Sequence, residues 1–96
     1  MNTMKLVFPR YCLKRMIERQ IGVDDVRNVL DTGELIERYA ADEPPRCLML
    51  GWSDSRPIHV IAEDDPVSGE TTVVTAYEPE RKLWKAGFKE RKGVRK

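Results

Sequence analysis

His59 is the only histidine of this 96-residue chain, and its position suits a role in proton transfer. It lies in the apolar segment Pro57–Glu63, whose residue types and alternation predict a β-strand. Because successive residues of a strand point to opposite faces, Ile58, Val60 and Ala62 would form a buried row, and His59 would point away from it. An imidazole titrates near neutral pH, so it can serve as a general acid or a general base.

Tyr77 is the residue that the sequence places opposite His59. The segments Pro57–Glu63 and Thr71–Glu78 flank a polar turn, and an antiparallel hairpin about that turn pairs residue 59 with residue 77. The two side chains share a face only if no β-bulge interrupts the pairing. Because the ordinary pKa of a tyrosine is about 10, Tyr77 suits an acid or a hydrogen-bonding role better than a base. A structural hydrogen-bonded pair is the alternative to a catalytic one.

Tyr11, Arg15 and Arg19 are four residues apart and form one stripe of a predicted helix that could lie over the same face. Acid–base cleavage of a phosphodiester is one chemistry open to such residues, and it needs an acceptor for the proton of the attacking hydroxyl, cations for the developing phosphate charge, and an acid for the leaving oxygen. His59, Tyr77 and Arg19 are therefore the candidate catalytic residues, and Arg15 could clamp a phosphate. An ion pair between Arg19 and acidic residues further along the chain is the alternative.

Other side chains could bind nucleic acid without taking part in chemistry. Trp52 lies beside a polar turn and is expected to be exposed, so it could stack on a base, whereas Trp84 is expected in the core. Basic residues near the end of the chain could contact phosphates regardless of sequence, and a solvated charged tail is the alternative. The nucleic-acid contacts predicted in addition to Trp52 and Arg15 are Lys82, Lys85, Lys89, Arg91 and Lys92.

The net charge of +1 hides an uneven distribution of charge along the chain. The first 22 residues carry a net charge of +4, residues 23–80 carry −10, and residues 81–96 carry +7. Such a separation can steer an anionic partner to one face, or it can neutralise itself within the fold.

Length and composition indicate one small domain over residues 1–96, with 41% hydrophobic residues available for a core. No apolar run approaches the ~18–20 residues of a membrane span, and Met1–Leu6 is too short and polar for a signal peptide. Cys12 and Cys47 lack the spacing of a metal site or a disulfide framework, and they are expected to be small buried hydrophobes. We therefore expect a reduced, cytoplasmic protein without a cofactor, a metal ion or a membrane partner.

The pattern of apolar residues predicts an α+β domain. Leu13, Met16 and Ile17 recur at helical spacing, and Gly33 could end a second helix in the left-handed conformation. Two N-terminal helices would pack on a four-stranded antiparallel meander, with a short N-terminal edge strand before them and a basic C-terminal helix after it. The expected helices are residues 10–20, 23–31 and 81–91, the expected strands are 5–8, 35–39, 47–52, 57–63 and 71–78, and residues 92–96 should fray.

Three segments, "RMIERQIGVDDVRNVLDTGELIERY", "LMLGWSDSRPIHVIA" and "VVTAYEPERKLWKAGFKERK", resemble a family of small bacterial proteins of unknown function. The shared features are an Arg-Met-x-x-Arg helix, an Asp-Val helix, a Pro-x-His-Val strand, and Tyr-x-Pro-x-x-x-x-Trp before a basic end. That family looks like a relative of the RelE-, BrnT- and MqsR-like toxins. The chain departs from the pattern early in the first helix, where Tyr11 stands in place of the usual His and Cys12 in place of Ala.

The resemblance implies a RelE/BrnT-like fold and a toxin-like protein of a bacterial toxin–antitoxin pair. Such a protein would be a metal-independent endoribonuclease or an RNA-binding protein, and its partners would be RNA and an antitoxin, of the zinc-finger type in some pairs. A non-catalytic protein-interaction module is the alternative, and Tyr11 and the single histidine favour it. A homodimer formed through an exposed sheet edge is a third interpretation.

Overall fold

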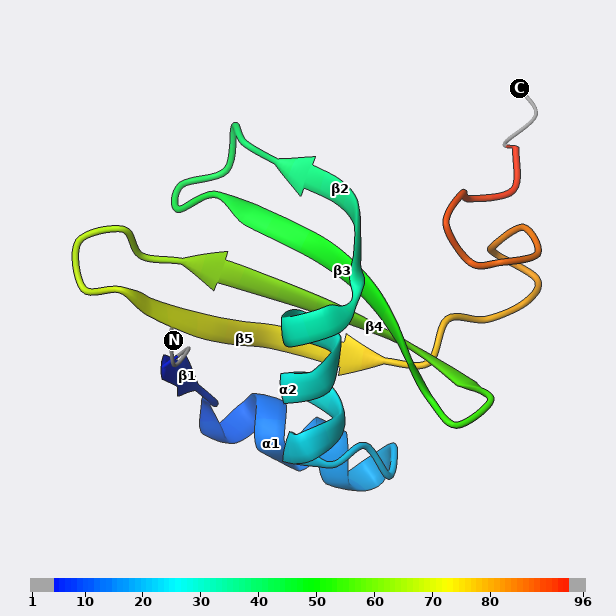
Figure 1. The fold of residues 1–96 in the computed structure, drawn as a ribbon, viewed down its shortest axis with the longest axis horizontal. Helices are drawn as coiled ribbons and strands as arrows, with labels where there is room; N and C mark the ends of the chain where they lie inside the picture. Colours follow the sequence, from blue (N-terminus) through cyan, green and yellow to red (C-terminus); the bar gives the residue numbers. More distant parts are fainter. Residues whose placement is uncertain (1–4, 94–96) are drawn as a thin grey trace.

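The computed structural model describes residues 5–93 and shows one mixed sheet with two helices on one face and the segment after the last strand at one end (Figure 1). The strands lie in the order β1-β5-β4-β3-β2. β2 to β5 are joined as an antiparallel meander, and β1 adds to β5 in parallel. The elements are β1 (Lys5–Val7), α1 (Arg10–Glu18), α2 (Val23–Thr32), β2 (Glu34–Tyr39), β3 (Arg46–Ser53), β4 (Arg56–Asp64) and β5 (Glu70–Tyr77).

The two helices form where the apolar spacing predicts them. Met16 of α1 and Val26 of α2 are buried against the sheet, whereas Ile17, expected on the buried face, is 75% exposed. The N-terminus of α2 begins after Gly22, whose N–H donates to the Asp25 carboxylate at 2.9 Å. An acidic residue in the first turn also interacts favourably with the helix dipole. Neither described helix is long and apolar enough to cross a membrane.

The helix α2 lies very close to the sheet because glycines stand at the points of contact. A Cβ atom on Gly51 of β3 would come within 2.6 Å of the Val29 Cγ2 atom, and one on Gly33 would collide with the carbonyl oxygens of Val29 and Leu50. Gly33 has a φ of −78° and is extended, so the expected left-handed conformation is not the reason for this glycine. Its role is to permit close backbone approach.

The prediction of a purely antiparallel sheet of four strands is wrong, because β1 adds a fifth strand that is parallel to β5. Leu6 pairs with Thr71, and Lys5 is within 3.3 Å of the Glu70 carboxylate. A strand was expected at this position and is present. Its partner and direction could not be inferred, since three residues carry no signal of what they pair with.

The prediction of a C-terminal helix is also wrong. Residues 79–93, which we call the strap, form turns closed by an isolated bridge between Trp84 and Arg91. Gly87 (φ 89°) and Phe88 (φ 59°) are left-handed, and helices do not contain such residues in their interior. Like charges along the strap also disfavour a helix. Residues 92–96 were expected to fray. Lys92 is instead bonded to the strap, because its N–H donates to the Leu83 carbonyl oxygen at 3.0 Å. Residues 94–96 lie outside the described residues.

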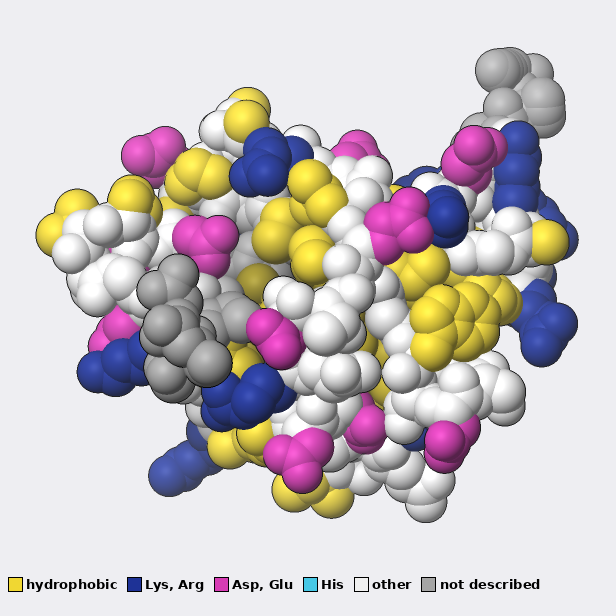
Figure 2. All heavy atoms as spheres, in the orientation of Figure 1, with side chains coloured by type: hydrophobic (Ala, Val, Ile, Leu, Met, Phe, Trp, Pro, Cys, Tyr) yellow, Lys and Arg dark blue, Asp and Glu magenta, His cyan; other side chains and the backbone are white. Residues whose placement is uncertain are grey.

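The sheet separates two apolar clusters. One lies under the helices and consists of Cys12, Met16, Ile21, Val26, Val29, Ile58, Val60, Val73 and Ala76. The other lies under the strap and consists of Leu48, Leu50, Trp84 and Phe88. On the face seen in Figure 2, Lys and Arg side chains are dispersed among acidic ones at both ends of the molecule, so on that face the basic termini do not merge into one patch.

Candidate functional site

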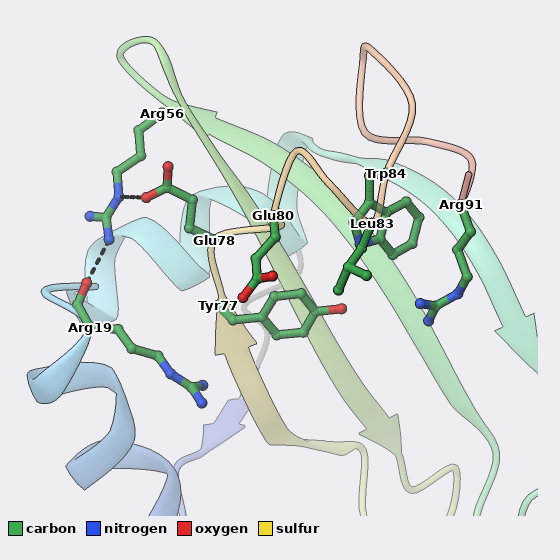
Figure 3. A pocket seen from close by; sticks show the side chains of 8 residues that line it. All are labelled: Arg19, Arg56, Tyr77, Glu78, Glu80, Leu83, Trp84 and Arg91. Atoms are coloured by element: carbon green, nitrogen blue, oxygen red, sulfur yellow. Dashed lines mark hydrogen bonds and ion pairs between the residues drawn. The ribbon is translucent and has the colours of Figure 1, made fainter. Parts of the chain in front are cut away.

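An open pocket of about 520 Å³ lies where the end of α1, the end of β5 and the strap meet (Figure 3). We call it the arginine pocket, because three arginines reach it from different parts of the chain. Two of the predicted site residues, Arg19 and Tyr77, and one predicted nucleic-acid contact, Arg91, line it together. The lining residues are Arg19, Arg56, Tyr77, Glu78, Glu80, Leu83, Trp84 and Arg91.

His59 lies behind this pocket and is fully buried. Its Nε2 atom is 2.9 Å from the carbonyl oxygen of Phe88, and its Nδ1 atom is 3.3 Å from the hydroxyl oxygen of Tyr77. A carbonyl oxygen only accepts, so Nε2 carries the hydrogen and Nδ1 accepts from the Tyr77 hydroxyl. The Trp84 ring meets the imidazole edge-on, with centroids 4.5 Å apart. His59 therefore reaches the pocket only through Tyr77.

The predicted register of the β4–β5 hairpin is confirmed at this point. His59 pairs with Tyr77, but a bulge that was not expected lies between this pair and the turn, at Ile61 and Ala62. The two side chains consequently share a face and their rings are 5.3 Å apart. The sequence placed the pair correctly, but it gave no sign that the strap would cover it.

Burial sets the protonation state of the pair. Burial lowers the pKa of His59, the Phe88 carbonyl opposes this by favouring the charged ring, and the nearby Arg91 lowers the pKa further. Burial likewise raises the pKa of Tyr77, which Arg91 partly offsets. Both groups are therefore neutral at neutral pH, with the tyrosine proton directed at the imidazole.

Arg56 is the pocket residue that the sequence interpretation missed. Its Nε donates to Glu78 at 2.8 Å, its Nη1 to the carbonyl oxygen of Gln20 at 2.7 Å, and its Nη2 to the carbonyl oxygen of Arg19. All three guanidinium nitrogens are thus used to cap the C-terminal end of α1 and join it to the sheet. The hairpin register that pairs His59 with Tyr77 also brings residue 56 close to residue 78, and this signal could have located it.

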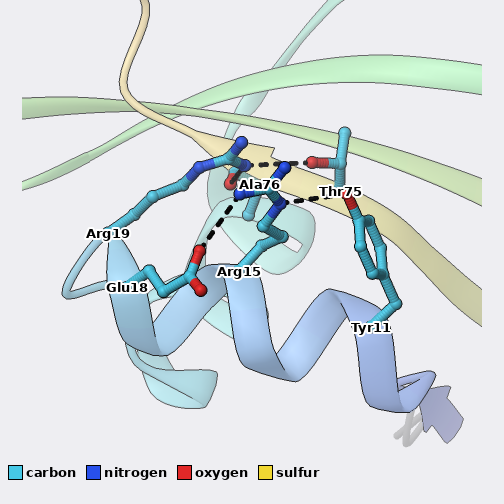
Figure 4. A network of polar contacts seen from close by, with 6 residues as sticks. All are labelled: Tyr11, Arg15, Glu18, Arg19, Thr75 and Ala76. Atoms are coloured by element: carbon cyan, nitrogen blue, oxygen red, sulfur yellow. Dashed lines mark hydrogen bonds and ion pairs between the residues drawn. The ribbon is translucent and has the colours of Figure 1, made fainter.

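Arg19 holds α1 against the edge of the sheet (Figure 4). Its Nη1 atom donates to the Ala76 carbonyl oxygen at 2.9 Å and lies 3.3 Å from the Thr75 hydroxyl. The alternative considered for Arg19 was an ion pair with acidic residues further along the chain, but its partners are these two oxygen atoms of β5. Arg15, by contrast, is outside the arginine pocket and donates to the Tyr11 hydroxyl at 3.0 Å and to Glu18 at 3.1 Å.

Arg91 is the exposed cation of the pocket. Its guanidinium carbon is 4.6 Å from the centroid of the Trp84 ring, which holds the side chain by a cation–π contact. Arg56 is neutralised by Glu78, so the charge that a ligand would meet comes from Arg19 and Arg91 against Glu80. The pocket is therefore weakly positive and suits a singly charged anion.

The other predicted nucleic-acid contacts do not converge on this pocket. Trp52 and Lys89 line a second hollow, and Lys82 lines a third beside Pro57 and Phe88. Lys85 forms an ion pair with Glu90 at 3.2 Å.

The described residues contain no group of three or more His, Cys, Asp or Glu side chains arranged to hold a metal ion. Cys12 is buried and Cys47 is partly buried, and both are free thiols. Burial raises the pKa of each, so neither is an activated thiolate. Cys12 agrees with the expectation of a small buried hydrophobe.

Comparison with known proteins gives one match. A family model described as a domain of unknown function, DUF4258, matches residues 10–78, which include both helices, β2 to β5 and the His59–Tyr77 pair but not the strap. No curated protein and no solved structure matches the chain. The description of the family names no activity, so the relation to RelE-, BrnT- and MqsR-like toxins stays a prediction. The chain belongs to the DUF4258 family of domains of unknown function.

Proposed function

We propose that this protein is toxin-like, holds an RNA phosphodiester in the arginine pocket, and cleaves RNA there without a metal ion. The observation that carries the proposal is the convergence of Arg19, Arg91 and the Tyr77 hydroxyl on one open pocket. The relation to toxins rests on the resemblance of the sequence, and the antitoxin partner is part of the same proposal.

Arg19 and Arg91 would stabilise the phosphate. A guanidinium group matches two phosphate oxygens with two parallel N–H groups, and the pair reaches the pocket from opposite sides (Figure 3). Each of the three guanidinium nitrogens of Arg56 already donates to a partner within the protein, so its contribution is to fix the helix end that carries Arg19. The third group, Tyr77, would face the ribose.

Cleavage by this route joins the ribose 2′-oxygen to phosphorus and expels the 5′-oxygen, which leaves a 2′,3′-cyclic phosphate and a 5′-hydroxyl end. The 2′-hydroxyl proton passes to the Tyr77 oxygen while the Tyr77 proton passes to Nδ1 of His59, and the leaving oxygen takes a proton from water. The hydroxide ion that remains takes the Tyr77 hydroxyl proton while His59 returns its extra proton to Tyr77, which restores both neutral groups. Because burial disfavours the imidazolium ion that forms, we expect slow turnover.

A non-catalytic interaction module is the second candidate. The observation that favours it is the burial of His59, whose two ring nitrogens both have partners within the protein. A buried, fully bonded histidine is the usual arrangement of a structural residue. The two candidates differ in whether RNA is bound and cut.

Labelled single-stranded RNA in EDTA tests both parts of the proposal. We expect binding that weakens steeply between about 50 and 200 mM salt, and a slow appearance of cyclic-phosphate ends. Arg91→Gln should weaken binding several-fold and reduce the salt slope by about 1. Tyr77→Phe should abolish cleavage and leave binding nearly unchanged.

Arg38→Gln is the matched control, because Arg38 lies on β2 and lines a different pocket. It should bind and cleave RNA as the unmodified protein does. Absence of RNA binding at low salt would overturn the proposal and favour the interaction module. Binding without cleavage would remove the nuclease step and leave an RNA-binding protein.

A further inference from the structure

A second hollow, of about 550 Å³, lies between the C-terminal half of α2, the start of β2, the end of β3 and the strap. Its size is within the range of pockets that bind small molecules. It is separate from the arginine pocket, with which it shares no lining residue. We call it the tryptophan hollow, and its lining includes Asn28, Thr32, Glu34, Trp52 and Lys89.

Trp52 gives this hollow a flat aromatic wall. The side chain is 46% exposed although it belongs to a paired strand, and its ring meets Phe88 edge-on with centroids 6.1 Å apart. The contact with Phe88 and the pairing with Pro57 fix the ring without covering it. An exposed, fixed indole ring is a surface on which another ring can stack.

Glu34 gives the same hollow a hydrogen-bond acceptor. Its carboxylate is 3.1 Å from Nζ of Lys89, and both side chains are more than half exposed. Surface ion pairs of this kind contribute little free energy, so a ligand can replace Lys89 as the partner of the carboxylate. The C-terminal end of α2 adds negative potential beside it. The hollow is therefore suited to a ring that presents N–H donors.

The surroundings of Trp52 favour a nucleobase over an apolar protein surface. A protein interface would need a continuous apolar patch around the indole, as at an interface hot spot. The neighbours of Trp52 in the hollow are instead glycines and polar side chains, apart from Leu50, which is 3% exposed.

We propose that the tryptophan hollow binds an unpaired RNA base, stacked on Trp52 and read by Glu34, with guanine preferred. Guanine presents N1–H and N2–H together, which a carboxylate can accept with its two oxygens, whereas uracil presents one N–H group. This inference deepens the proposed function and rests on it, because it supplies a base subsite for RNA whose phosphate is held in the arginine pocket.

Titration with guanosine and uridine tests the hollow without the arginine pocket, because neither nucleoside carries a phosphate. The probe is the indole N–H signal of Trp52 in a nitrogen–proton NMR spectrum, with that of the buried Trp84 as an internal reference. We expect guanosine to shift the Trp52 signal at lower concentration than uridine. Glu34→Gln should remove the difference between the two nucleosides, whereas Glu43→Gln, also exposed, should keep it.

Short RNAs that differ in one central base extend the test to the polymer. Trp52→Ala should weaken binding by roughly 5- to 150-fold, the effect of losing one stacked base, and Trp52→Phe should restore part of it. Val67→Ala, which removes another exposed apolar side chain, should have no effect. Equal shifts with guanosine and uridine, or no shift at Trp52, would overturn the base subsite while salt-dependent RNA binding would still support the proposed function. RNA binding that is lost in Arg91→Gln but unchanged in Trp52→Ala would likewise overturn the base subsite and still support the proposed function.

Discussion

The two faces of the sheet are covered in different ways. On one face, two regular helices pack small and medium apolar side chains at helical spacing, and glycines allow α2 to approach closely. On the other, an irregular strap inserts Trp84 and Phe88 around a buried imidazole. The helix face depends on many similar contacts, whereas the strap face depends on a few large ones and on directional hydrogen bonds. Local changes should therefore affect the two faces differently.

The largest effect is expected for Trp84→Ala. Trp84 is 4% exposed and contacts both His59 and Arg91, so its truncation should lower the free energy of unfolding by about 3–5 kcal/mol. Urea denaturation measures this decrease. The comparison is Met16→Ala on the helix face, which should lower the free energy of unfolding by about 2–5 kcal/mol. In Trp84→Ala, the rate of amide hydrogen exchange should increase more in the strap than in the rest of the protein. A change smaller than about 1 kcal/mol would mean that the strap is not part of the core.

A smaller effect is expected for Gly51→Ala on the helix face. The added Cβ would lie 2.6 Å from the Val29 Cγ2 atom and 3.1 Å from the Val29 Cα atom, so α2 must move. Such overpacking costs about 1–3 kcal/mol in the free energy of unfolding, which thermal or urea denaturation detects. Gly93→Ala is the control, since a Cβ there meets no atom within 4 Å. Equal stability of the two variants would show that the close approach of α2 is not required.

The smallest effect, and the most specific, is expected for His59→Gln. The glutamine Nε2 can replace the ring Nε2 as the donor to the Phe88 carbonyl, but no atom takes the position of Nδ1 as the acceptor for Tyr77, at a cost of about 1–2 kcal/mol at neutral pH. The stability of the variant should also lose the part of its pH dependence that comes from His59. The folded protein holds the pKa of His59 below its ordinary value of 6.5, so the unfolded chain binds more protons and stability falls as the pH drops below that value.

Urea denaturation at about pH 7.5 and about pH 5.5 measures this slope in both proteins. The stability difference between the unmodified protein and His59→Gln should shrink as the pH falls, because only the unmodified protein loses the histidine contribution. A difference that is constant with pH would contradict the assignment of a neutral, buried imidazole in the folded state.

The parts of the fold that could be predicted are those governed by a regular pattern. Helical spacing located α1 and α2, alternation located β3 to β5, and the expected pair of His59 and Tyr77 is present, although it depends on a bulge that the sequence did not predict. The strap could not be predicted, because its Trp84 and Phe88 are set by left-handed residues rather than by a period. The helix expected over residues 81–91 took Leu83, Trp84 and Phe88 as its apolar contacts, and the burial of the two rings in a non-helical strap overrides that local preference.

The structure brings some of the predicted site residues together, and their roles stay predictions. Arg19 and Tyr77, expected in one site, and Arg91, expected to contact phosphates elsewhere, line one pocket, whereas Trp52 and Lys89 line another hollow and Arg15 lines neither. Arg56 was overlooked because its partners are backbone carbonyl oxygens at the end of a helix. Such capping by a residue distant in sequence depends on tertiary packing, which no local pattern encodes.

The parallel pairing of β1 with β5 also sets an order of events during synthesis. β1 leaves the ribosome before every other described strand, and its hydrogen-bonding partner leaves after all of them. Until residues 70–72 have emerged, the nascent chain carries β1 without its strand partner. Pairing of β1 therefore has to wait for β5, and contacts between segments so distant in sequence are expected to slow folding.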